Sequence, residues 1–127
     1  MFCFDFKAYH GDVDDYGVLY HANYLRYFEY ARREILDSFN LSHLCFAVKR
    51  LEIDYMRPIL KGRLMRIETR LSVGTRPMLL EARQGMRCIE TRVLYCEMRC
   101  DLVSVSRNLG VIRISDELIK FLQEKKT

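Results

Sequence analysis

The feature that most constrains the fold of this chain is a period-two alternation of apolar and charged residues through its second half. In one such segment, Met65, Ile67 and Leu71 alternate with Arg66 and Glu68. This alternation is typical of β-strands that have one face on a core and the other in water. The same pattern covers residues 50–55, 65–73, 78–88 and 94–102. The links between these segments are too short for crossover helices, so we expect antiparallel pairing.

The first third of the sequence adds a strand and a helix. Residues 1–9 place three phenylalanines on one face at period two, which predicts a fifth strand. Residues 21–39 carry apolar side chains at helical spacing, which predicts one long helix. Near the end, Ser115 precedes two acids and is the expected N-cap of a short C-terminal helix. These elements predict an α+β fold with a five-stranded antiparallel sheet wrapped around the long helix, the hotdog arrangement.

Composition excludes several classes of protein. With 127 residues, half of them hydrophobic, residues 1–127 should form a single domain with one core. No apolar run approaches the roughly 20 residues of a membrane-spanning helix, and residues 1–9 do not resemble a secretory signal. Five cysteines without a CxxC pair indicate reduced thiols in the cytoplasm, and three dispersed histidines argue against a metal site.

The net charge of +4 comes from basic residues that are spread along the chain and alternate with acids. No basic cluster with interleaved aromatic residues is present, so we do not expect a nucleic-acid partner. A diffuse positive excess suits a small anionic substrate equally well.

The densest group of turn-forming residues lies between the first strand and the long helix. Residues 10–20 contain Gly11, Asp12, Asp14, Asp15 and Gly17, which favour turns and unusual backbone angles. Acids before a helix are most often capping and dipole partners. The residues that follow nevertheless form a longer pattern.

That pattern is the DxD pair Asp12 and Asp14, the Gly17-Val18 step, the run Tyr20-His21-Ala22-Asn23-Tyr24-Leu25 and the turn Phe28-Glu29-Tyr30-Ala31-Arg32. Over about 25 residues it resembles the 4-hydroxybenzoyl-CoA thioesterase family of hotdog proteins. It is most similar to the YbgC-type acyl-CoA thioesterases that are associated with the Tol-Pal envelope system.

The resemblance implies an enzyme that hydrolyses an acyl-CoA thioester, with Asp14 as the catalytic carboxylate and Asp12 as a supporting group. It implies a homodimer or a homotetramer, and no cofactor, since coenzyme A belongs to the substrate. An ionised aspartate could attack the thioester directly or deprotonate a water molecule, and both routes stay open.

The remaining candidates follow from the chemistry of the thioester. Backbone N–H groups at the helix start at His21 can hold the oxygen that becomes negative, and the imidazole of His21 can orient the substrate. Gly17 allows close approach of the substrate to the backbone. Substrate contacts are further expected from Tyr20 and, for the phosphates of coenzyme A, from Arg57, Lys61 and Arg76.

A protein of another class could use the same pocket without catalysis, as a module that binds acyl-CoA or acyl carrier protein. Asp14 and Gly17 favour the enzyme over this alternative. A hotdog dehydratase would need a histidine and an acid in a different pattern. The identity of the acyl group, and the choice between coenzyme A and acyl carrier protein as its carrier, stay open.

Overall fold

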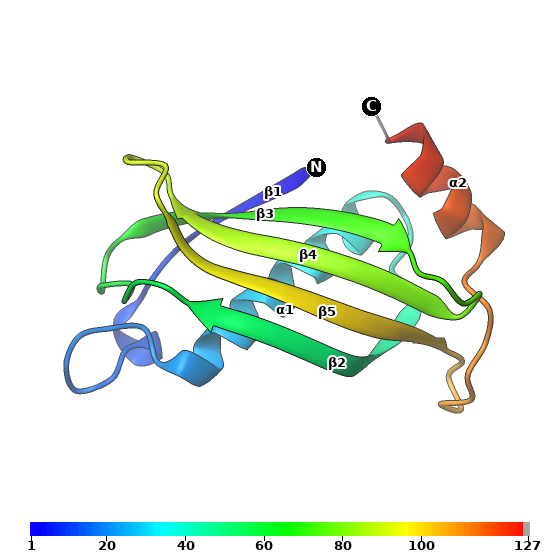
Figure 1. Ribbon diagram of the computed structural model, residues 1–127, viewed down its shortest axis with the longest axis horizontal. Coiled ribbons are helices and arrows are strands. Elements are labelled where there is room, and N and C mark those ends of the chain that lie inside the picture. The colour runs from blue at the N-terminus through cyan, green and yellow to red at the C-terminus, as the bar shows by residue number, and fades with distance from the viewer. Residues whose placement is uncertain (126–127) are drawn as a thin grey trace.

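A computed structural model describes residues 1–125 as one antiparallel sheet with two helices (Figure 1). Its elements are β1 (Phe2–Lys7), a short 3-10 helix (His10–Asp12), α1 (His21–Ser38), β2 (Cys45–Tyr55), β3 (Leu64–Val73), β4 (Leu79–Cys88), β5 (Leu94–Val105) and α2 (Asp116–Glu124). The strand order is β1-β3-β4-β5-β2, so β1 and β2 are the edges. The predicted α+β fold is confirmed. Neither helix in residues 1–125 is both long and apolar enough to cross a membrane.

The core lies between α1 and one face of the sheet. Figure 1 shows α1 running behind the strands, with the opposite face of the sheet toward the viewer. Of the stripe that its periodicity predicted, the helix buries Tyr24, Tyr27, Phe28, Ala31 and Ile35, and it also buries Leu36. Phe39, the last residue of the predicted stripe, is instead 41% exposed because it lies just beyond the end of the helix. Most of the buried side chains belong to the same buried cluster as the apolar positions of the central strands, including Met65, Ile67 and Met86. Burial of this apolar surface is the main force that holds α1 on the sheet.

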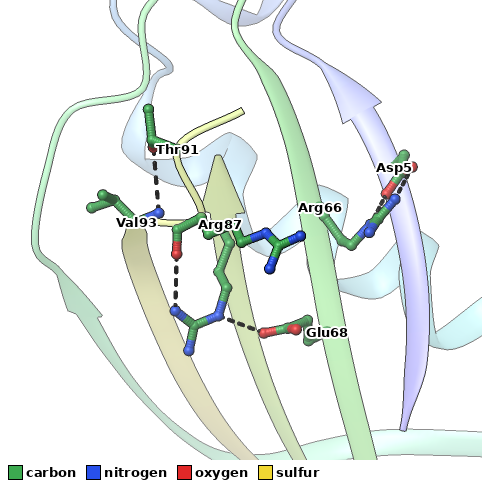
Figure 2. Close-up of polar contacts among 7 residues, drawn as sticks. Asp5, Arg66, Glu68, Arg87, Thr91 and Val93 are labelled. Atoms are coloured by element: carbon green, nitrogen blue, oxygen red, sulfur yellow. Dashed lines mark hydrogen bonds and ion pairs between the residues drawn. The ribbon is translucent and has the colours of Figure 1, made fainter. Parts of the chain in front are cut away.

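The outer face of the sheet carries charged side chains that pair across strands. Figure 2 shows Asp5 on β1 accepting hydrogen bonds from Arg66 on β3, at 2.7 and 3.0 Å. On the neighbouring strand, Arg87 donates to Glu68 at 2.7 Å. The hydrogen bond from Arg66 holds the pKa of the Asp5 carboxyl below its usual range. Exposed pairs of this kind contribute little stability, but opposite charges on neighbouring strands favour the observed register.

Strand β2 starts earlier than its alternation predicted. It begins at Cys45 rather than at residue 50. The alternation missed the first residues because a register shift between Val48 and Arg50 reverses which positions face the helix. Leu51 and Tyr55 were predicted to lie inward, yet they are 36% and 46% exposed. The reason is that β2 is an edge strand with no neighbour on its outer side.

The end of α1 differs slightly from the prediction, whereas the start of α2 agrees with it. The long helix ends at Ser38, and Phe39 is its C-cap, with the ring packed against Phe121 of α2 at 4.7 Å between centroids. The predicted N-cap of α2 is confirmed, because the hydroxyl of Ser115 accepts a hydrogen bond from the N–H of Leu118.

Candidate functional site

The loop before α1 folds around the side chain of Asp14. Its Oδ1 accepts hydrogen bonds from the backbone N–H of Tyr16 at 2.8 Å and of Val18 at 3.3 Å. The backbone of Asp14 closes the same turn, donating to the carbonyl of Val18 and accepting from Gly17. Gly17 has φ of +77°, a conformation that residues with a Cβ rarely adopt. Within residues 1–125 the second oxygen of Asp14, Oδ2, makes no hydrogen bond.

A second segment, which precedes β3, holds this loop in place. The N–H of Leu19 donates to the carbonyl of Ile59 at 2.7 Å, and the N–H of Lys61 donates to the carbonyl of Gly17 at 3.0 Å. Ile59 is fully buried, so the pairing is anchored in the core. The structure therefore brings Lys61 beside Gly17, two of the residues that the sequence proposed for substrate contact.

Asp12 ties the loop to the helix. The hydroxyl of Tyr27 donates a hydrogen bond to its Oδ2, and Arg26 forms a 3.9 Å ion pair with its Oδ1. The backbone carbonyl of Asp12 also accepts from the side-chain amide of Asn23 at 2.9 Å and from the N–H of Tyr20. Burial of Tyr27, together with its bond to this carboxylate, raises the pKa of the phenol. This geometry fits the supporting role that was predicted for Asp12.

The start of α1 is open to solvent. Tyr20 occupies the N-cap position, but its side chain makes no capping hydrogen bond, and no acid lies in the first turn. The N–H groups of His21 and Ala22 have no acceptor among the described residues. The rings of Tyr20 and His21 lie 4.4 Å apart, and both side chains are exposed. The helix start thus offers two backbone donors and the positive end of a helix dipole.

The two arginines proposed for phosphate contact lie at opposite ends of the sheet. Tyr55, at the end of β2, donates to the carbonyl of His21 at 3.0 Å, and Arg57 follows two residues later. Arg57 is therefore at the same end as the helix start. Arg76 lies in the turn between β3 and β4, which Figure 1 shows at the far end of these strands. Within one chain, Arg76 is not part of the group around Asp14.

Residues 16–83 match a sequence model of the thioesterase superfamily. The chain belongs to this superfamily. The matched segment covers more than half of the chain and runs from the loop around Asp14, through α1, to the middle of β4. Membership confirms the family that the motif between Asp12 and Arg32 predicted.

Relatives with known names support the same family. An acyl-CoA thioesterase YbgC from Haemophilus influenzae is 39% identical over 56% of this chain and 58% of its own length. An acyl-CoA thioesterase YbgC from Helicobacter pylori is 30% identical over 69% of this chain and 68% of its own length. The chain thus spans less than two thirds of the length of the first relative and slightly more than two thirds of the length of the second.

A solved structure shows that the fold is shared over the whole length. The 1,4-dihydroxy-2-naphthoyl-CoA thioesterase from Synechocystis superposes with a TM-score of 0.88 and 15% identity, covering 97% of this chain and 96% of its own. At this identity the similarity concerns the fold of the superfamily.

The sequence did not single out Tyr27 and Asn23, two residues of α1 that donate hydrogen bonds to Asp12 and so hold the loop. Tyr27 was counted only as part of the apolar stripe, and Asn23 only as part of the motif. A signal for Tyr27 was present, because a buried tyrosine hydroxyl needs a hydrogen-bond partner, and the nearby loop is rich in acids. No group of His, Cys, Asp or Glu side chains in the described part of the chain is arranged to hold a metal ion.

Proposed function

We propose that this chain is an acyl-CoA thioesterase, which hydrolyses a coenzyme A thioester to a free acid and coenzyme A, with Asp14 as its catalytic carboxylate. The observation that carries the proposal is the way the loop holds Asp14. Two backbone N–H groups fix Oδ1, whereas Oδ2 is not engaged by the described residues. A carboxylate held through one oxygen keeps the other for reaction. The names of the YbgC relatives agree with this activity.

Two routes are consistent with such a carboxylate. As a general base, Asp14 takes a proton from water while the water oxygen adds to the thioester carbonyl carbon. As a nucleophile, its Oδ2 attacks that carbon and forms a mixed anhydride, which water then hydrolyses. In both routes the C–S bond breaks, and the departing thiolate of coenzyme A takes up a proton.

The helix start would supply the second catalytic element. When the thioester carbonyl becomes tetrahedral, its oxygen gains negative charge and needs donors. The N–H groups of His21 and Ala22 lack acceptors in the described chain, and the dipole of α1 favours an anion at this end. Donors of this type contribute roughly 10²- to 10³-fold in rate. The exposed imidazole of His21 lies where it could help to orient the substrate.

Coenzyme A carries several phosphate groups, so its binding should involve basic residues near this end of the sheet. Lys61 is bonded through its backbone to Gly17, and Arg57 follows the strand whose Tyr55 contacts His21. We propose these two residues for phosphate contact, together with Tyr20 at the helix start. Acyl carrier protein is an alternative carrier of the acyl group.

The location that we propose is the cytoplasm, because all five cysteines are free thiols.

The edge of β2 suggests that the active enzyme is oligomeric. This edge strand exposes Val48, Leu51 and Tyr55 and lacks a neighbour on its outer side. Unpaired edges with apolar side chains favour pairing with another chain. We propose a homodimer that joins two sheets through β2, and a homotetramer of two such dimers. Because Tyr55 contacts the carbonyl of His21, the proposed active site would lie beside this interface.

Release of free thiol from a panel of short-chain, long-chain and aromatic acyl-CoA esters tests the activity. Asp14→Asn keeps a side-chain oxygen for the two backbone bonds but removes the charge, so we expect a loss of about a hundredfold or more in kcat. Asp15→Asn is the matched control, since Asp15 is the exposed neighbour of Asp14. Circular dichroism checks that both variants fold.

Equal turnover in wild type and Asp14→Asn would refute the assignment of Asp14. Tight binding of acyl-CoA without turnover by the wild-type protein would favour the non-catalytic acyl-binding module. A preference for acyl carrier protein thioesters over coenzyme A esters would identify the carrier.

A further inference from the structure

A narrow slot opens between the second half of α1 and the inner face of the sheet, next to the β2 edge. Its volume is about 80 Å³. Six of its nine lining residues are aliphatic or aromatic, namely Leu36, Phe46, Val48, Leu71, Leu80 and Leu102. Arg32 projects from α1 into the same lining, and Glu29 and Arg33 also contribute to it. The slot therefore combines an apolar body with a cationic group.

Arg32 is held in this position by a buried amide. Its Nη1 donates to Oε1 of Gln84 at 2.8 Å, and the Gln84 side chain is only 3% exposed. The amide nitrogen of Gln84 donates to the carbonyl of Phe28 and to the hydroxyl of Thr69, both at 3.0 Å. With both acceptors on its nitrogen side, Gln84 must present its oxygen to Arg32. The guanidinium is therefore preorganised.

Arg32 forms no ion pair in the described part of the chain, although the carboxylate of Glu29 attracts its charge from a longer distance. Gln84 is neutral, and no ion pair of Arg32 occurs among residues 1–125. The neighbouring Arg33, by contrast, lies 4.0 Å from the carboxylate of Asp37. Glu29 is exposed at the rim of the slot and forms no ion pair with Arg32. Burial lowers the pKa of the Arg32 guanidinium, which is the expected response of a cation removed from water.

A partly buried cation without a directly bonded counter-charge is costly, and an anion in the slot beside Arg32 would relieve that cost. The planar guanidinium matches a carboxylate particularly well. The apolar side chains of the slot favour a ligand in which a hydrocarbon body is attached to the carboxylate. At about 80 Å³ the slot is roughly half as large as a cavity of ~150 Å³ that encloses benzene, so it takes a short hydrocarbon segment and leaves the rest of a longer body at its mouth.

We propose that this slot is a binding site for a short-chain or aryl carboxylic acid, whose carboxylate pairs with Arg32 and whose hydrocarbon body lies against the leucines. Such an acid belongs to the class that the proposed hydrolysis releases, and only this link to the reaction rests on the proposed function. Arg32 lies eleven positions after His21 in α1, which is about 16 Å along the helix axis. Within one chain the slot is thus distinct from the loop around Asp14.

Titration of the protein with hexanoate, followed by calorimetry and by the NMR signal of the Arg32 Nε–H, tests the site. We expect saturable binding to the wild type, and binding weaker by roughly tenfold or more in Arg32→Met. Arg83→Met, in which an exposed arginine of β4 outside the slot is changed, should bind like the wild type. Hexanol has the same hydrocarbon body without the charge, and should also bind roughly tenfold more weakly.

The proposal is overturned if hexanoate does not bind saturably to the wild type. It is also overturned if hexanol binds the wild type as tightly as hexanoate does, or if Arg32→Met binds hexanoate as tightly as the wild type does. The Nε–H signal of Arg32 in the wild type decides the question even if Arg32→Met does not fold. Hexanoate binding by a protein that hydrolyses no thioester leaves the site standing and rejects the proposed function. Thioester hydrolysis without hexanoate binding does the reverse.

Discussion

Replacement of Tyr27 by phenylalanine isolates the contact that joins the loop to α1. The Tyr27 ring is 7% exposed and stacks on Phe6 at 4.0 Å between centroids. Phenylalanine retains this packing and removes only the hydroxyl that donates to Asp12. The substitution therefore reports on one hydrogen bond to a carboxylate.

The expected loss follows from the surroundings of that bond. Hydrogen bonds to charged groups contribute about 1.5–3 kcal/mol. The side chain of Asp12 is 18% exposed, so water replaces the hydroxyl only in part. The ion pair with Arg26 is long, at 3.9 Å, and Arg26 is exposed, so it compensates little. We expect a loss of about 2 kcal/mol, or a fall in Tm of about 6–10 °C for a chain of this size.

Urea unfolding at one fixed protein concentration measures this change. Tyr30→Phe is the control, because Tyr30 lies on the same helix with its side chain exposed, and its effect should stay within about 0.5 kcal/mol. A loss from Tyr27→Phe no larger than that of the control would refute the view that this bond anchors the loop.

The pH dependence gives an independent check. A phenol has a pKa near ~10 in an unfolded chain, and the pKa of Tyr27 is raised in the fold. The stability that Tyr27 contributes is thus fully present below pH ~10 and declines as the pH rises above that value. The difference in stability between wild type and Tyr27→Phe should shrink on going from pH 9 to pH ~11. A difference that stays constant over this interval would contradict the contact.

Two further predictions concern the loop backbone and the assembly. Gly17→Ala should lower stability by about 1–2 kcal/mol in urea unfolding, because Gly17 has φ of +77°, whereas Gly11→Ala lacks this strain and should change little; equal effects would argue against the strained turn. Light scattering should give two or four times the chain mass of 15.2 kDa, and the mass of one chain would contradict the proposed pairing through β2.

Much of the fold was predictable because local patterns agreed with the tertiary arrangement. The apolar stripe of α1 and the alternation in β3, β4 and β5 each named the buried face correctly. Ser115 marked the start of α2. The prediction was wrong at the first half of β2, where the shift between Val48 and Arg50 breaks the period. A bulge changes which positions face inward, and a periodicity argument has no means of anticipating it.

The candidate site was also predictable only in part. The motif located the loop, the helix start and the family, and the family is confirmed. The roles of Asp14, His21 and the substrate-contact residues stay predictions. Gln84 sits at an inward position of β4 where an apolar residue was expected, and its meaning depends on Arg32 and Thr69 from other elements.

The sequence by itself determined the elements and the α+β fold, because spacing within a segment fixes which side chains share a face. The family followed from the resemblance of the motif between Asp12 and Arg32. Only the tertiary structure decided that Asp12 bonds to Tyr27, that Lys61 lies beside Gly17 and that Arg32 lines an apolar slot. The physical reason is that such contacts join residues from different elements. Their distances depend on how a helix packs on a sheet, which no local pattern records.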